Sequence, residues 1–225
     1  MTTLTTRHFA TRASLDGALE ERLRQAIAAP GATAIMLSGG STPLPAYRRL
    51  ARGPLPHDDR LHVLFSDDRY VPADSPASNY FQSRPLLDAL ALPEESLLRV
   101  RTELPLDEAA ADYEQRLAAL LSAGVHIGLG LLGLGGNGHT ASLFTAADLA
   151  RARGRYAIPV QRPDGMAAVS VTPELLATVR EPLFVVAGGD KHDAIAALET
   201  QDMGLTAWRA VQGCPQAELW VHEER

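Results

Sequence analysis

Hydrophobic residues recur along this chain in two alternating patterns, short uncharged runs and apolar positions at helical spacing. The uncharged runs predict buried strands at 32–37, 61–65, 125–134 and 183–187, and weaker patterns predict strands at 156–160, 168–172 and, at a sheet edge, 219–221. Helical spacing predicts helices at 14–27, 43–51, 79–90 and 107–121, the last capped by Asp107. Strands that alternate with helices are typical of a parallel sheet, so we expect an α/β fold.

The apolar run 125–134 ends in a glycine loop, Gly135-Gly136-Asn137-Gly138, which leads to His139 and a predicted helical turn at 140–144. In an open parallel sheet, ligands bind at the carboxyl ends of the strands, where this loop places backbone N–H groups. Imidazole titrates near neutrality, which makes His139 the natural proton-transfer group of the chain. A polar loop with an incidental histidine is the alternative interpretation of this stretch.

A second strand end, after 32–37, carries the loop Ser38-Gly39-Gly40-Ser41-Thr42, and Pro43 then suits the first turn of a helix. Two glycines allow the backbone to approach an anion, and hydroxyl and N–H groups can donate to it. The loop lacks the lysine of a Walker motif. It predicts a phosphate site, with a glycine turn and a capping serine as the alternative.

Charged residues follow two further strands. Asp67, Asp68 and Arg69 follow 61–65 after Ser66, and we expect all three to point into the crevice at the sheet edge. An arginine fork suits phosphate or carboxylate, and acids can orient it. Lys191 follows 183–187 at a helix start, where a cation is slightly unfavourable, so an anionic ligand is a sensible explanation. The alternatives are a solvated turn and a surface lysine.

Composition limits the classes of partner and the location. The 225 residues suit one domain, 1–225, and the net charge of -6 gives no reason to expect nucleic acid or an anionic membrane surface as a partner. The single cysteine, Cys214, excludes an internal disulfide and fits a reducing compartment. No run resembles a signal peptide or a membrane span, so we expect a cytoplasmic protein. The seven histidines show no ligand-spaced pair, so we expect no metal.

Glycines inside the apolar run 125–134 match one cofactor pattern only superficially. Gly128, Gly130 and Gly133 have the spacing of a dinucleotide fingerprint, but they fall inside the predicted strand rather than in the turn after it. No acid stands at a strand end near position 155 to bind a ribose. We therefore expect no nicotinamide cofactor.

The four strand ends together read SGGSTP, DDRYVPADSPASN, GLGGNGHTASLF and GGDK, in that order. This combination resembles the 6-phosphogluconolactonase family, whose superfamily also holds the glucosamine-6-phosphate deaminases. The resemblance runs from about residue 32 to 191 and continues more weakly as far as Trp220. Arg69 and the sequence TASLF at 140–144 favour the lactonases, because the deaminases usually have Asp-Glu-Tyr and Gly-His-Ile-Ala-Phe there.

The resemblance implies a Rossmann-like three-layer α/β/α fold with a mostly parallel sheet, and no cofactor. It also implies hydrolysis of a small phosphorylated sugar lactone, 6-phosphogluconolactone, in the oxidative pentose phosphate pathway. We expect a monomer or weak homodimer. His139 would activate water, and N–H groups of 135–138 could meet the oxyanion. The residues expected to bind substrate or phosphate are Ser38, Gly39, Gly40, Ser41, Thr42, Arg69, Asn137, Gly138 and Lys191.

Several positions depart from the lactonase pattern. Asp68 stands where a glutamate is usual, Asn137 where an aspartate is usual, and Ala168 where an arginine is frequent, while Glu223 supplies the acid expected after the C-terminal tryptophan. Two alternatives stay open. One is an isomerase or deaminase in which Asp67 abstracts a substrate proton, and the other is a sugar-phosphate sensor without turnover.

Overall fold

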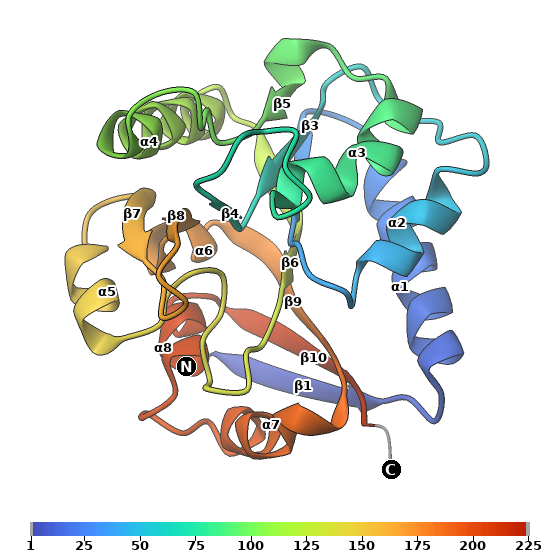
Figure 1. The fold of residues 1–225 in the computed structure, drawn as a ribbon. Coiled ribbons are helices and arrows are strands. Elements are labelled where there is room, and N and C mark those ends of the chain that lie inside the picture. The colour runs from blue at the N-terminus through green and yellow to red at the C-terminus, as the bar shows by residue number, and fades with distance from the viewer. Residues whose placement is uncertain (1, 224–225) are drawn as a thin grey trace.

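The computed structural model describes residues 2–223 and has a seven-stranded parallel sheet at its centre (Figure 1). In spatial order its strands are β1 (Thr3–His8), β10 (Gln216–His222), β9 (Val179–Ala187), β6 (His126–Leu132), β2 (Thr33–Leu37), β3 (Leu61–Phe65) and β5 (Leu97–Leu98). All neighbouring pairs in this sheet are parallel. The predicted α/β fold with a mostly parallel sheet is confirmed.

Helices cover both faces of this sheet, because its strands are apolar on both sides. Ile35 and Leu37 pack on one face, beneath α1 (Arg12–Ile27), α2 (Leu44–Leu50) and α3 (Asn79–Leu90). Ala34 and Met36 face the other side. The helices there are α4 (Leu106–Ser122), α5 (Ala146–Arg151), α6 (Pro173–Leu176), α7 (His192–Glu199) and α8 (Thr206–Val211). These two helical layers and the sheet make the three-layer arrangement that the resemblance implies.

A small antiparallel sheet on the second face was not predicted. It consists of β4 (Asp67–Arg69), β8 (Ala167–Val171) and β7 (Ala157–Gln161). Ser66 links the two sheets. Its N–H donates to the Leu37 carbonyl of the large sheet at 2.8 Å, and its carbonyl accepts from the Val171 N–H of the small sheet at 2.9 Å. The predicted strands at 156–160 and 168–172 are therefore present, but in a second sheet. Both sheets contribute residues to one hydrophobic core cluster.

The prediction for the C-terminal strand is wrong in its position. Strand β10 is an inner strand, because β1 pairs with it in parallel, Thr3 opposite Gln216. The sequence pattern did not predict β1, since TLTTRH is polar and half-exposed, as suits the true edge of a sheet.

Two local predictions also need correction. Residues 140–144 form no helical turn: Thr140 makes an isolated bridge to Leu143, and the helix begins at Ala146, where Thr145 and Asp148 form a capping box. Asp107 does not cap α4, whose N-cap is Pro105, and lies instead in its first turn, where an acid favours the helix dipole. None of the helices formed by residues 2–223 has the length and hydrophobicity needed to cross a membrane.

Candidate active site

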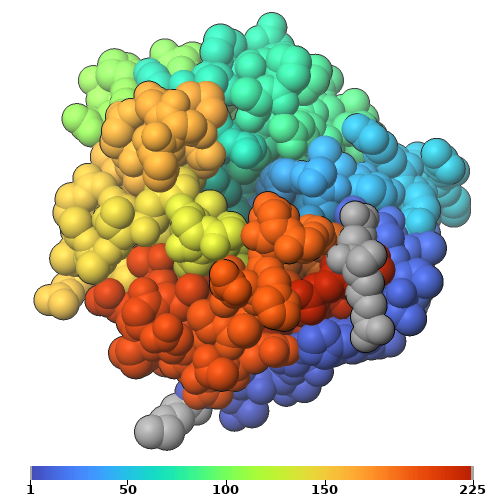
Figure 2. All heavy atoms as spheres, turned by 60° about the horizontal axis from the view of Figure 1, so that its bottom comes forward, coloured from blue at the N-terminus to red at the C-terminus, as the bar shows by residue number. Residues whose placement is uncertain are grey.

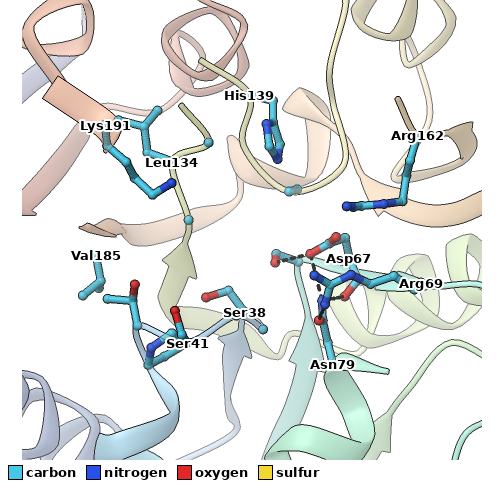
Figure 3. A pocket seen from close by; sticks show the side chains of 18 residues that line it. Ser38, Ser41, Asp67, Arg69, Asn79, Leu134, His139, Arg162, Val185 and Lys191 are labelled. Atoms are coloured by element: carbon cyan, nitrogen blue, oxygen red, sulfur yellow. Dashed lines mark hydrogen bonds between the residues drawn. The ribbon is translucent and has the colours of Figure 1, made fainter. Parts of the chain in front are cut away.

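A cavity of about 290 Å³ lies at the carboxyl edge of the large sheet, where the loops after β2, β3, β6 and β9 meet. On the molecular surface it opens among the blue segment near residue 40, the yellow-green segment that carries the glycine loop, and orange segments from later in the chain (Figure 2). Eight of the residues predicted to form the site line it: Ser38, Gly39, Gly40, Ser41, Thr42, Arg69, His139 and Lys191. Figure 3 shows His139 between Lys191 and Arg162, above Ser38 and Asp67.

The Ser38–Thr42 loop takes its shape from specific contacts. A Cβ atom at Gly39 would overlap the side chain of Asn79, so only glycine fits there. Gly40 has a φ of 89°, a left-handed conformation that glycine adopts without strain. The hydroxyl of Tyr47 donates to the Ser38 carbonyl at 2.9 Å. The loop groups and nearby cations define this end of the cavity.

Strand β4 places Asp67 and Arg69 in the cavity and turns Asp68 away, because alternate side chains of a strand point to opposite sides. Our expectation that all three point into the crevice is therefore wrong for Asp68. Its carboxylate accepts hydrogen bonds from the N–H of Asn79 at 2.6 Å, from Tyr80 N–H at 3.2 Å and from the Ser78 hydroxyl at 3.0 Å, and thereby caps α3. Burial raises the pKa of Asp68 to about 6.

We expect Asp68→Ala to destabilise the fold by roughly 3 kcal/mol, because three donors at the start of α3 lose a buried charged acceptor. Urea denaturation of the wild type and the variant measures the loss. Asp74→Ala is the matched control, since Asp74 is an exposed acid in the neighbouring loop. Equal losses in the two variants would contradict a capping role for Asp68.

Asp67 and Asn79 form a polar cluster on the cavity wall. The buried Asp67 carboxylate accepts from the hydroxyls of Ser66 at 3.1 Å and Ser142 at 2.7 Å, and from the Asn79 amide at 3.2 Å. The amide oxygen of Asn79 in turn accepts a hydrogen bond from Arg69. Asn79, rather than an acid, therefore orients the arginine. Sequence reasoning missed this role, because nothing marks Asn79 beyond its place in the second motif.

The histidine loop fixes both the position and the tautomer of His139. The N–H of Gly135 donates to the His139 carbonyl at 2.9 Å, and a Cβ at Gly135 would overlap the imidazole ring. Nδ1 of His139 contacts the side-chain oxygen of Asn137, an acceptor, so Nδ1 carries the proton. The ring also packs on Phe144, with centroids 4.3 Å apart. Nε2 is left as the basic nitrogen.

The surroundings of His139 keep its imidazole neutral. Burial lowers the pKa of His139 to about 4, and the carboxylate of Asp67 opposes this shift. Three cations that line the cavity lower the pKa further: Arg162, Lys191 and Arg69. A neutral imidazole at physiological pH can accept a proton, which a general base requires.

Asn137 and Gly138, predicted to bind substrate, lie outside the cavity lining. Asn137 instead contacts the imidazole from behind. Gly138 has a φ of 80°, its carbonyl accepts from the Ala207 N–H at 2.9 Å, and a Cβ there would overlap Leu205. Both residues therefore shape and anchor the loop that carries His139.

The glycine loop offers fewer free donors than the sequence suggests. The N–H of Gly135 bonds the His139 carbonyl, and that of Gly138 bonds the Gly135 carbonyl at 2.9 Å. These two N–H groups cannot also meet a substrate oxyanion, which corrects that part of our expectation.

Two cations reach the cavity from opposite sides (Figure 3). Lys191, whose side chain is 23% exposed, lies 3.4 Å from the Asp190 carboxylate. Arg162, which the sequence placed only in a turn, has a side chain 13% exposed and an ion pair with Asp164 at 3.0 Å. Its guanidinium donates to the Ser142 hydroxyl at 3.3 Å. The β7–β8 hairpin thus brings an arginine to the cavity although position 168 holds alanine.

Comparison with known proteins now identifies the family. The family model for glucosamine-6-phosphate isomerases/6-phosphogluconolactonase matches residues 8–217. A 6-phosphogluconolactonase of Synechocystis sp. is 36% identical over 219 residues, which cover 91% of this chain and 87% of that protein. The chain belongs to this glucosamine-6-phosphate isomerase/6-phosphogluconolactonase family.

Solved structures place the family's two branches on the same fold. The crystal structure of 6-phosphogluconolactonase from Thermotoga maritima superposes with a TM-score of 0.83 at 25% identity, over 99% of this chain and 100% of that one. A monomeric glucosamine-6-phosphate deaminase superposes with a TM-score of 0.80 at 16% identity, over 98% of this chain and 97% of that one. The fold therefore does not distinguish the branches of the glucosamine-6-phosphate isomerase/6-phosphogluconolactonase family, and the cavity must do so.

Proposed function

We propose that this chain hydrolyses 6-phospho-D-glucono-1,5-lactone to 6-phosphogluconate, the lactone step of the oxidative pentose phosphate pathway. The observation that carries the proposal is a neutral imidazole of fixed tautomer, His139, in one cavity with a hydroxyl- and glycine-rich loop and three cations. The relatives named 6-phosphogluconolactonase support the same activity.

In the proposed mechanism, Nε2 of His139 takes a proton from water as the water oxygen attacks the lactone carbonyl carbon. The carbonyl π electrons move to its oxygen, which becomes an oxyanion. When the carbonyl re-forms, the bond to the ring oxygen breaks, and the imidazolium returns the proton to that oxygen. Water is consumed, a carboxylic acid and a hydroxyl result, and the mechanism uses neither metal nor cofactor.

The remaining cavity residues hold the two ends of the substrate. We propose that the Ser38–Thr42 loop, Lys191 and Arg69 bind the phosphate, because hydroxyls, N–H groups and cations converge there. Arg162 stands 5.3 Å from the centroid of the Phe144 ring, and the same ring packs on His139. The guanidinium of Arg162 is therefore placed to stabilise the oxyanion next to the base, His139.

A paired assay separates this function from the two alternatives. Purified protein is incubated with freshly made lactone and, separately, with glucosamine 6-phosphate, and 6-phosphogluconate and ammonia are measured. We expect accelerated product formation from the lactone only. Ammonia release would favour the deaminase, and binding of 6-phosphogluconate without turnover of either compound would favour the sensor.

The Asn137 contact leads to a pH prediction. In Asn137→Asp a carboxylate replaces the amide beside Nδ1, and an adjacent negative charge favours the imidazolium. The pKa of His139 should rise, so the acid limb of the kcat/KM profile should move to higher pH. Rates above that limb serve as the internal control for folding. Identical profiles in wild type and variant would restrict residue 137 to loop geometry.

We further propose that the protein is cytoplasmic and is a monomer or a weak homodimer. Its proposed partner is a small phosphorylated lactone, and we expect it to bind no nucleic acid. The buried, unpaired Cys214 supports a reducing compartment.

A further inference from the structure

Arg12, on the first turn of α1, contacts the Ser38–Thr42 loop from outside the cavity. Its Nη2 donates to the Thr42 carbonyl at 2.8 Å and to the Ser41 carbonyl at 3.2 Å. Its Nε donates to the carboxylate of Asp16 at 2.7 Å, and the Asp16 side chain is only 10% exposed. One guanidinium therefore joins α1 to two successive peptide groups of the loop.

These contacts fix the orientation of two peptide groups of the loop. In a planar trans peptide, the carbonyl of one residue and the N–H of the next point in opposite directions. The Ser41 carbonyl points to Arg12, so the Thr42 N–H points away from Arg12. Ser41 and Thr42 line the cavity and Arg12 does not, so Arg12 holds these two carbonyls from outside the cavity lining.

A second arginine lies beside the same acidic side chain of α1, and its Nε and Nη2 make no hydrogen bond to the loop carbonyls. Arg49 of α2 lies 3.9 Å from the same Asp16 carboxylate and 3.1 Å from the Glu20 carboxylate. Its side chain is 34% exposed, close to the 32% of Arg12. Loss of Arg49 weakens the same α1–α2 ion-pair network while leaving the loop carbonyls bonded, which makes it a matched control.

We propose that Arg12 is a positioning residue for phosphate recognition, which holds Ser41 and Thr42 so that their N–H and hydroxyl groups face the substrate phosphate. This inference rests on the proposed function, because it assigns the phosphate to the Ser38–Thr42 loop. Arg12 touches no substrate atom. Since His139 lies on a different loop, Arg12 controls binding of the phosphorylated end and leaves the chemical step unchanged.

The test compares Arg12→Met, Arg12→Lys and Arg49→Met. For each variant KM and kcat are measured with the phosphorylated lactone and with unphosphorylated glucono-1,5-lactone, and the affinity for 6-phosphogluconate is measured by calorimetry. In Arg12→Met we expect KM for the phosphorylated lactone to rise about tenfold, as for the loss of one charge-assisted contact, with kcat within about twofold. In Arg12→Lys we expect a KM between those of the wild type and Arg12→Met, because an ammonium group lacks the planar fork that spans Asp16 and two carbonyls.

The controls decide between positioning and general stability. Arg49→Met should lower the melting temperature without changing KM, and the unphosphorylated lactone should not distinguish Arg12→Met from wild type. A wild-type KM in Arg12→Met, or an equal rise in Arg49→Met, would overturn the proposal. If Arg12→Met does not fold, wild-type KM and affinity in Arg12→Lys would overturn it equally. A wild type that binds 6-phosphogluconate without hydrolysing lactone would refute the proposed function alone, and calorimetry would still test Arg12.

Discussion

His139→Gln should lose at least about a hundredfold in kcat while it folds normally and still binds 6-phosphogluconate. Glutamine keeps a polar side chain of similar length but cannot accept and return a proton near neutral pH. General-base catalysis usually contributes ~10²–10⁴-fold, and spontaneous hydrolysis of the lactone sets the floor. The Ser38–Thr42 loop and Lys191 lie on segments other than the loop that carries His139, so KM should change little where it reflects binding.

The control for this variant is a pair of measurements on the same sample, ligand affinity by calorimetry and turnover above the uncatalysed background. Turnover close to wild type would contradict the role of His139 as base. Joint loss of ligand binding and thermal stability would instead indicate a structural histidine that supports the glycine loop through Gly135 and Phe144.

Lys191→Met should raise KM for the phosphorylated lactone about ten- to a hundredfold, because a charged contact to phosphate contributes on the order of 1.5–3 kcal/mol. Methionine retains the apolar stem of lysine and removes only the ammonium group. Turnover at saturation should remain near wild type, since His139 stays in place. Lys191→Arg is the conservative control and should recover part of the affinity. An unchanged KM in Lys191→Met would remove Lys191 from the site.

Lys191 can also be tested chemically, because it is the only lysine in a chain with 21 lysines and arginines together. An amine acylating reagent has two targets, this side chain and the α-amino group. We expect 6-phosphogluconate to protect Lys191 from the reagent and to leave the α-amino group reactive. Equal labelling of Lys191 with and without the ligand would contradict its place in the phosphate site.

The sequence predicted the parts of the site that depend on the order of strands and loops. Buried strands that end in SGGST and GGNGH converge whenever the sheet is parallel, because their carboxyl ends share one edge. Ser38, His139 and Lys191 therefore line one cavity as expected. Composition also draws attention to Lys191, because it is the only lysine of the chain. The order of the strands does not show this.

What the sequence could not predict depends on the second sheet. Strand β4 pairs with β8, and this pairing decides that Asp67 faces the cavity while Asp68 caps α3. Arg162 reaches the cavity from the β7–β8 hairpin, where its guanidinium contacts Ser142 and Phe144, and its turn sequence looks like any solvated turn. Pairing between distant strands leaves no local pattern in the sequence.

The most direct test of the proposed activity is the initial rate of lactone hydrolysis at several protein concentrations. Freshly generated 6-phospho-D-glucono-1,5-lactone is followed by the appearance of 6-phosphogluconate near neutral pH, with the spontaneous rate recorded in parallel. We expect a rate that rises above the spontaneous one in proportion to the protein added. A rate equal to the spontaneous one at every concentration of correctly folded protein would contradict the proposed hydrolysis.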